Sequence, residues 1–174
     1  EERWHREGMP EGQSSYDYYG FEIRGYWGDN SLQLERKVIE ETDDYIIATD
    51  GNGATMKNWK HRTTTPELVD FLIKSRAIWE EYKPRRAYND RRVDWSGARA
   101  AYDDARAKGL FFYLGWGPGF TQVCDMVGPE RLLIAMVEEP EWAKDMFMTD
   151  AQVCVAIAEE MMARGFDFDA GEAA

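Results

Sequence analysis

A continuous apolar run over residues 110–115, LFFYLG, constrains the fold of this chain more than any other segment. It has the length of a strand, and an uninterrupted apolar strand is typical of a parallel sheet that is covered on both faces. Two short helical patterns follow over 119–127 and 129–138, and a long one over 140–164 leads to a second strand at 166–170. This order of strand, helices and strand predicts βα units and a parallel sheet in the second half of the chain.

The first half of the chain has a different pattern. Residues 38–39 and 45–47 are β-branched or aromatic and suit two strands. The Asp-Gly-Asn-Gly sequence at 50–53 predicts a hairpin turn between strands, because Gly and Asn accept the positive φ angles of tight turns. We therefore expect an antiparallel hairpin region near residues 34–60.

Further helices are predicted before the apolar strand. Residues 66–83 begin with a proline suited to a first helical turn, but Ser75 could equally cap a shorter helix over 76–83. The charged residues 84–95 are expected to form a solvated loop, and residues 96–108 another helix.

Composition excludes several classes of function. The net charge of −12 argues against binding nucleic acid through its phosphates. Apolar runs of only a few residues predict no membrane-spanning helix. The two cysteines, Cys124 and Cys154, suit a reducing cytoplasm rather than a disulfide framework. His5 and His61 are too few for a metal site built from histidines.

The turn after the apolar strand is the strongest candidate for a site. In parallel sheets ligands bind at the carboxyl ends of strands, where glycines allow close approach and exposed amides can meet an anion. The turn lacks the G-x-G-x-x-G dinucleotide fingerprint, and no Gly-Lys-Ser/Thr of a P-loop follows. The alternative is a tight turn without a ligand. The candidate substrate-binding residues are Gly115, Trp116, Gly117, Pro118, Gly119 and Phe120, with Trp116 as a stacking wall.

The run YLGWGPGFTQVCDMVGPERLLIAMVEEPEWAKDMF, followed by ARGFDFD, resembles the uroporphyrinogen decarboxylase family. That family shows a strand, a glycine-rich turn with proline, an aromatic residue and Thr, and then a helix. A G-x-E-x-LL segment, a helix opening with P-E-W and a short acidic strand follow. The segments RWHREGMPEG, YDYYGFE and LERKVIEETDDYIIATDGNG resemble a divergent branch of the family, so the resemblance covers nearly the whole chain.

The resemblance implies a (β/α)8 TIM barrel with its active site at the carboxyl-terminal mouth. Residues 1–174 would then be a single domain, a partial barrel truncated at both ends, with the antiparallel region near 34–60 as an insertion. The implied activity belongs to porphyrin biosynthesis: cofactor-free decarboxylation of the acetate side chains of a tetrapyrrole, in which an acidic residue stabilises a pyrrole cation. The implied partner is a small-molecule substrate, and the resemblance allows a homodimer of the full-length protein.

The chain departs from the family pattern in its charged residues. The amino-terminal arginine motif R-Q-A-G-R-Y does not occur. The tyrosine of the family's T-x-x-T-Y-M-V pattern falls on Asp125, when the pattern is aligned on Thr121. The family's pyrrole-facing acid lies in an F-S-D-I-L strand, which has no clear counterpart in this sequence. Asp29 is a candidate for it. Asp169 is a second catalytic candidate beside Asp125, because Asp167 and Asp169 alternate along the last strand and one face of a barrel strand points inward.

Two other functions stay open on the same fold. Zinc-dependent methyltransferases that act between a corrinoid and a thiol bind zinc through a His-x-Cys pair and a later Cys, which would lie beyond residue 174. Cys124 and Cys154 fall in helical patterns and suit a core, so no metal is expected within this chain. The missing arginine motif also leaves open a barrel that binds a ligand without catalysis.

Overall fold

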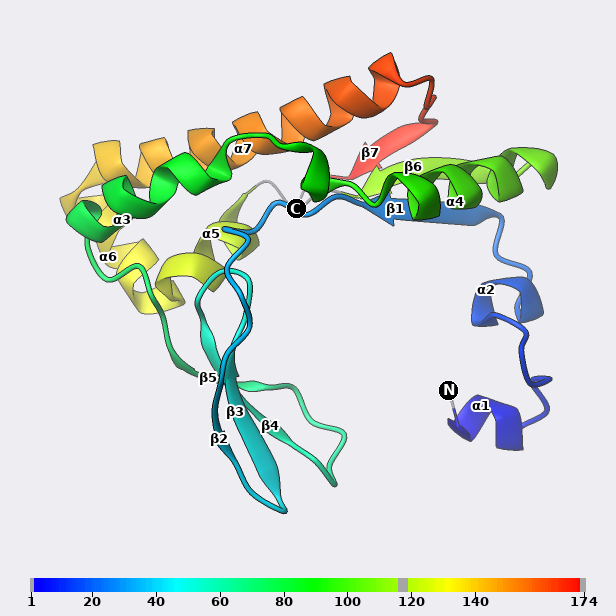
Figure 1. The fold of residues 1–174 in the computed structure, drawn as a ribbon, viewed down its shortest axis with the longest axis horizontal. Coiled ribbons are helices and arrows are strands. Elements are labelled where there is room, and N and C mark those ends of the chain that lie inside the picture. The colour runs from blue at the N-terminus through cyan, green and yellow to red at the C-terminus, as the bar shows by residue number, and fades with distance from the viewer. Residues whose placement is uncertain (1, 116–118, 173–174) are drawn as a thin grey trace.

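The structure is a computed structural model that describes residues 2–115 and 119–172, and it contains two separate sheets (Figure 1). The first is parallel, with strand order β1-β6-β7, and the second is antiparallel, with order β2-β3-β4-β5. The strands are β1 (Ile23–Trp27), β2 (Val38–Glu41), β3 (Tyr45–Thr49), β4 (Thr55–Trp59), β5 (Glu67–Asp70), β6 (Phe111–Gly115) and β7 (Ala170–Glu172). The helices are α1 (Glu2–Arg6), α2 (Ser15–Tyr18), α3 (Arg76–Tyr82), α4 (Trp95–Ala107), α5 (Phe120–Val127), α6 (Pro129–Glu138) and α7 (Pro140–Ala163), with 3-10 turns η1 (Lys83–Arg86) and η2 (Asp90–Arg92).

The expected partial (β/α)8 TIM barrel is wrong. The described residues hold three parallel strands and a separate four-stranded antiparallel sheet, with no repeating eightfold strand–helix pattern. The reason lies between β1 and β6, where the chain forms four consecutive antiparallel strands with no helix between them. Their turn is the predicted one: Gly53 has a φ of 78° and donates its amide to the Asp50 carbonyl at 3.1 Å.

The antiparallel region extends further than the sequence pattern indicates. Residues 67–70, which the longer helix prediction includes, form β5 and pair with β4. The helix starts only at Arg76, because the Ser75 hydroxyl caps it by accepting the Ile78 amide at 3.4 Å. The shorter of the two helix predictions is therefore the correct one.

Strand β6 is parallel, as predicted, but it is covered on one face rather than two. Phe112 and Leu114 are 0% and 2% exposed, whereas Phe111, on the other face, is 45% exposed. The covering helices, α4 and α7, pack on the same side of the sheet. The opposite face of β1 and β6 therefore stays open among the described residues, with the exposed side chains of Ile23 and Trp27 on it.

Helix α7 is shared by two hydrophobic clusters. Its carboxyl-terminal half joins α4 and β6 in a cluster that includes Phe112, Leu114, Val153, Ile157 and Met161. Its amino-terminal half joins α3, α5 and α6 in a second cluster that includes Trp79, Val123, Met126, Leu132, Trp142 and Met146. No helix in the described ranges is long and apolar enough to cross a membrane.

A buried ion pair lies on α7 between these clusters. The Arg86 guanidinium, from η1, donates to the Asp150 carboxylate, and both side chains are fully buried. Arg86 also donates to the Asn30 carbonyl, and Asp150 Oδ2 accepts the Gly119 amide at 3.0 Å. The pair therefore connects α7 with η1, with the loop after β1 and with the start of α5. The charged segment expected to be a solvated loop is thus partly a core element.

Burial works against the charged forms of both partners. It raises the pKa of Asp150 even though Arg86 and the Gly119 amide oppose the rise. It also lowers the pKa of Arg86, against the attraction of Asp150. Such a pair favours one arrangement of the chain more than it adds net stability, because desolvation offsets much of the Coulomb attraction.

We expect Asp150→Ala to lower the free energy of unfolding by about 3–5 kcal/mol, because it leaves the Arg86 charge buried without a partner. The double variant Arg86→Met/Asp150→Leu should recover most of this loss, since neither buried charge remains. Urea denaturation of the three proteins measures both effects. As a control, Asp103→Ala removes the exposed Arg99–Asp103 pair and should change stability little. A double variant as unstable as Asp150→Ala would contradict this account.

Candidate functional site

The carboxyl ends of β1 and β6 lie side by side, with Trp27 paired in register with Gly115. We call the carboxyl ends of these two strands, together with residues 28 and 29 after β1, the carboxyl edge. Ligands of parallel α/β folds bind at such an edge. Of the predicted substrate-binding residues, Gly115, Gly119 and Phe120 are described and flank this edge in the chain. Trp116, Gly117 and Pro118 lie outside the described residues.

Two glycines on the open face of the sheet make room for aromatic rings. A Cβ at Gly115 would come within 2.0 Å of the Trp27 indole nitrogen, and one at Gly25 within 2.5 Å of the Tyr113 ring. The rings of Trp27 and Tyr113 meet edge to face, with centroids 5.4 Å apart. We call these four residues the aromatic platform. Trp27 is 54% exposed, so its indole is accessible to a ligand.

Trp27 is not among the residues predicted from the sequence. The predicted stacking wall is Trp116, because Trp116 stands between the glycines of 115-GWGPG-119 in the sequence. The available signal was the alternation in 23-IRGYW-27, where residues 23, 25 and 27 share one face of a strand. Only the parallel pairing with β6 shows that Gly115 lies beneath the Trp27 ring.

The backbone amide at the start of α5 already donates its hydrogen bond to a carboxylate of the protein, that of Asp150. Gly119 has a φ of 141°, a conformation that disfavours other residues, and its amide donates to Asp150 Oδ2 at 3.0 Å. An internal acid thus takes the role that the sequence analysis gave to an anionic ligand at this amide. Phe120, the first residue of α5, is 43% exposed and remains available for apolar contact.

Asp29 provides an ionised carboxylate at the carboxyl edge, two residues after Trp27. Its Oδ1 accepts the Ser31 amide at 2.9 Å, and its Oδ2 accepts the Gln33 side-chain amide at 3.0 Å. Burial raises the pKa of Asp29, but these hydrogen bonds and the Arg92 charge outweigh it, so the pKa lies below its ordinary value. The exposed Asp29 side chain is therefore negatively charged at neutral pH.

Arg92 holds the loop that carries Asp29. Its buried guanidinium donates to the carbonyls of Asp29 at 2.7 Å and Ser31 at 3.0 Å. It also donates to the carbonyls of Ala87 at 3.0 Å and Arg85 at 2.5 Å. In addition, the Asp29 amide donates to the Arg92 carbonyl at 2.7 Å. These bonds fix the backbone at the end of β1 and thereby the position of Asp29.

Behind the edge the structure is closely packed. The hollow there, which Asn30, Gly115 and Cys154 help to line, has a volume of only about 10 Å³, too small for a substrate. Burial raises the pKa of the Cys154 thiol to about 11, so Cys154 stays protonated at neutral pH and is a poor nucleophile. Cys154 is a core residue, as its helical pattern predicts.

The catalytic candidate Asp125 lies on α5, half-buried, and interacts electrostatically with Asp50 of the β3–β4 turn. Burial raises the pKa of Asp125, and the like charge of Asp50 adds to the rise. The Asp50 carboxylate accepts the Asn52 and Ala54 amides, both at 2.9 Å. Asp125 therefore faces the antiparallel sheet.

The catalytic candidate Asp169 lies at the opposite end of the parallel sheet. Its Oδ2 accepts the Phe112 amide at 2.8 Å, near the amino end of β6, and forms an ion pair with Arg106 at 2.6 Å. Two hydrogen bonds lower the pKa of Asp169. The one from the Phe112 amide has the larger effect, and the one from Arg106 the smaller. Asp169 and the predicted substrate-binding residue Gly115 therefore lie at opposite ends of β6.

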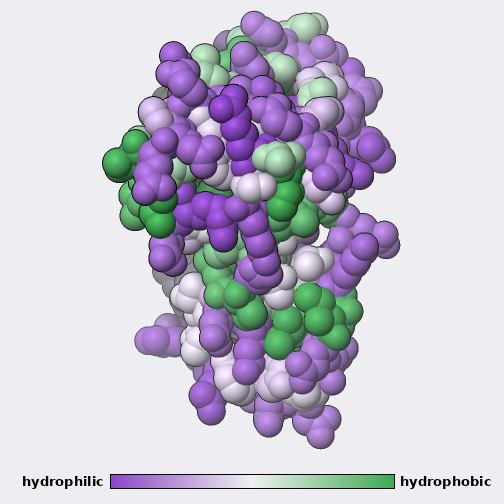
Figure 2. All heavy atoms as spheres, turned by 90° about the vertical axis from the view of Figure 1, so that its left-hand side faces the viewer, coloured by the Kyte–Doolittle hydropathy of each residue, from purple (hydrophilic) through white to green (hydrophobic). Residues whose placement is uncertain are grey.

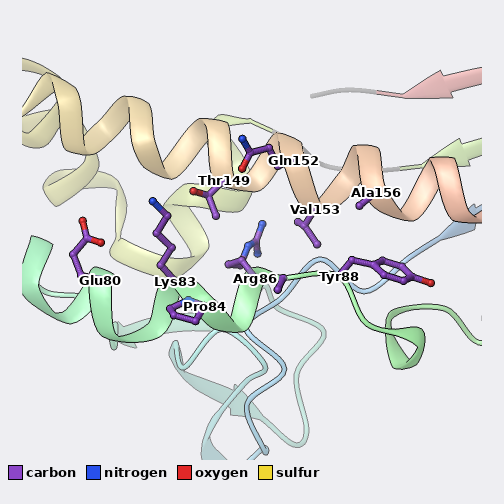
Figure 3. Close-up of a pocket in the computed structure, with 10 residues that line it drawn as sticks. Glu80, Lys83, Pro84, Arg86, Tyr88, Thr149, Gln152, Val153 and Ala156 are labelled. Carbon is purple, nitrogen blue, oxygen red and sulfur yellow. The ribbon is translucent and has the colours of Figure 1, made fainter.

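A larger hollow, of about 430 Å³, lies between η1 and α7 (Figure 3). Figure 3 shows the Arg86 side chain rising from η1 toward α7, between Thr149 and Val153. Lys83, also in its lining, forms an ion pair with Asp145 at 2.6 Å. Because both cations are paired with carboxylates of α7, this hollow is a weaker candidate for an acidic ligand than the carboxyl edge. Within the described ranges, no group of three His, Cys, Asp or Glu side chains is arranged to hold a metal ion.

No protein-family model, no curated protein and no solved structure matches this chain. The resemblance to the uroporphyrinogen decarboxylase family therefore stays a prediction from its motifs. The geometry of the carboxyl edge is the independent basis for a functional proposal.

The position of Asp169 predicts a structural role with a defined pH dependence. Because its folded-state pKa is lowered, its contribution to stability is complete above its ordinary value of 3.8 and is lost as the pH falls through the lower folded value. We expect Asp169→Asn to be less stable than the wild type at neutral pH, and the difference to close below pH 3.8. Thermal denaturation from pH 7 downward measures it, with the exposed Asp167→Asn as control. Unchanged stability at neutral pH would refute the structural role.

Proposed function

We propose that the carboxyl edge binds a planar, carboxylated ligand of the tetrapyrrole type, and that the chain is part of an enzyme that decarboxylates it without a cofactor. The observation that supports this proposal most is that the exposed indole of Trp27 and an ionised acid, Asp29, lie two residues apart in the chain at the end of β1. The family resemblance supplies the reaction class, and the edge supplies residues suited to it. The two unpaired cysteines favour a cytoplasmic location.

The platform suits a flat ligand for a geometric reason. Gly25 and Gly115 have no side chain, so the rings of Tyr113 and Trp27 can lie directly against the backbone of the sheet. A pyrrole ring could therefore stack against the exposed indole of Trp27, with Phe120 as a further apolar contact. Most ligand sites combine such apolar walls with a few fixed polar groups.

Asp29 suits the positive charge that protonation of the pyrrole ring creates before carbon dioxide leaves. A proton adds to a ring carbon of the pyrrole, and the bond between the acetate methylene and its carboxylate then breaks. The electron pair of that bond enters the cationic ring, and carbon dioxide leaves. A second proton adds to the methylene, which becomes a methyl group, and the ring releases the first. A fixed carboxylate beside the ring stabilises the cationic steps, because it is already ionised and held by hydrogen bonds.

The stacking role of Trp27 is testable by binding. We expect Trp27→Ala to weaken the binding of uroporphyrin, a stable oxidised probe, by about tenfold, since an aromatic pair adds about 0.5–1.5 kcal/mol beyond its buried area. Trp27→Phe should retain most of the affinity. Absorbance titration measures both, and Trp4→Ala, an exposed tryptophan on α1, is the matched control. Equal affinities of the Trp27→Ala and Trp4→Ala proteins would exclude the platform as the site.

The charge of Asp29 is testable by turnover. Asp29→Asn should leave uroporphyrin affinity within a few-fold but lower the rate of carbon dioxide release from uroporphyrinogen by about a hundredfold, because fixed groups of this kind contribute that order of magnitude. The assay compares release of labelled carbon dioxide by the two proteins. Absence of turnover by the wild type with every porphyrinogen offered, despite binding, would leave a binding protein and refute the decarboxylase proposal.

A further inference from the structure

Helix α6 presents apolar side chains on both of its faces. Leu132 and Ala135 are buried in the second hydrophobic cluster, as expected for an amphipathic helix. The outward face of such a helix is normally polar, yet here four large hydrophobic side chains lie between the exposed Glu130 and Glu138. With a neighbour on α7, the exposed residues form what we call the α6 surface: Leu133 at 54%, Ile134 at 48%, Met136 at 45%, Val137 at 81% and Met148 at 52% exposed.

A hollow flanks α6 on each side. Ile134 lines a hollow of about 550 Å³ together with Val69 and Phe71, and the charged residues Asp70, Glu130 and Arg131 lie at its rim. Met136 lines another of about 290 Å³ together with Phe147 and Met148. Figure 2 looks onto the side of the molecule where α6 lies and shows hydrophobic patches gathered among polar residues. A ridge between two hollows is a shape that receives the side chains of a docked helix.

The charges around the α6 surface restrict what can cover it. Glu130, Glu138, Glu139 and Glu141 are all exposed at the two ends of α6, and they outnumber the two cations beside them, Arg131 and Lys144, in a chain of net charge −12. A second copy would place glutamates against glutamates, and an anionic lipid surface would be repelled in the same way. A partner with Lys or Arg beside its apolar residues would complement both the ridge and its acidic ends.

We propose that the α6 surface is a docking site for a basic amphipathic helix of a protein partner. Its apolar side chains enter the two hollows, and its cations lie against the glutamates at the ends of α6. In Figure 1 α6 lies on the left of the molecule and β1 and β6 on the right, with α5 between them.

The probe is a labelled synthetic helix of about 18 residues, with Leu at helical spacing on one face and Lys elsewhere. Fluorescence anisotropy should show saturable one-to-one binding that weakens as salt rises, because the rim contacts are charged. A matched peptide with Glu in place of Lys should not bind. The single variants Ile134→Glu and Val137→Glu, both at exposed positions, should each weaken binding by about tenfold or more.

The control is Met162→Glu, which places the same charge at an exposed apolar position at the far end of α7. It should bind the Lys peptide as the wild type does. Equal affinities of all three variants for the Lys peptide would show that binding does not depend on the α6 surface and would overturn the proposal. Light scattering that finds a dimer dispersed by Val137→Glu would assign the surface to a second copy, and binding to phosphatidylserine vesicles lost in that variant would assign it to membranes; either result overturns the proposal.

Discussion

The Arg86–Asp150 ion pair is the interaction on which the arrangement of the other elements depends. Asp150 lies on α7 between the residues that this helix contributes to the two hydrophobic clusters. Through the Asn30 carbonyl and the Gly119 amide the ion pair reaches the chain directly after β1 and directly before α5. A buried charge is costly unless it keeps its partners. The pair therefore holds the loop after β1 and the start of α5 in place beside α7.

Local patterns predicted most of the helices but not the sheet architecture. The spacing and end signals of α5, α6 and α7 are local, and the structure has these helices within a residue or so of their predicted limits. The barrel prediction came from the family resemblance and was wrong, because the described residues form a three-stranded parallel sheet and a separate antiparallel sheet. The apolar run at 110–115 predicts only a parallel strand, which the structure has. Residues 67–70 form a strand because β4 offers its free edge, which overrides the proline at their start.

The candidate site was predicted in location but only in part by residue. The rule that ligands bind where parallel strands end identified Gly115, and this glycine does lie beneath an exposed indole. The positions of the acidic side chains were more difficult to predict, because they depend on tertiary contacts that the spacing of residues in the sequence does not reveal. Asp169 is bonded to the Phe112 amide at the far end of the sheet, and Asp125 faces Asp50. Arg86 and Arg92, in the charged run at 84–95, are buried by tertiary contacts in the same way, which the sequence of the run does not indicate.

The sharing of α7 by both clusters has a consequence for how this molecule opens. A helix that contributes Trp142 to one cluster and Met161 to the other cannot fray from either end without exposing apolar surface. The two halves of the fold should therefore lose their amide protection together, as one cooperative unit rather than two. Hydrogen exchange would then be slow and uniform along the middle of α7. Faster exchange would be confined to segments outside both clusters, such as α1 and the outer strands β2 and β5, whose residues are exposed.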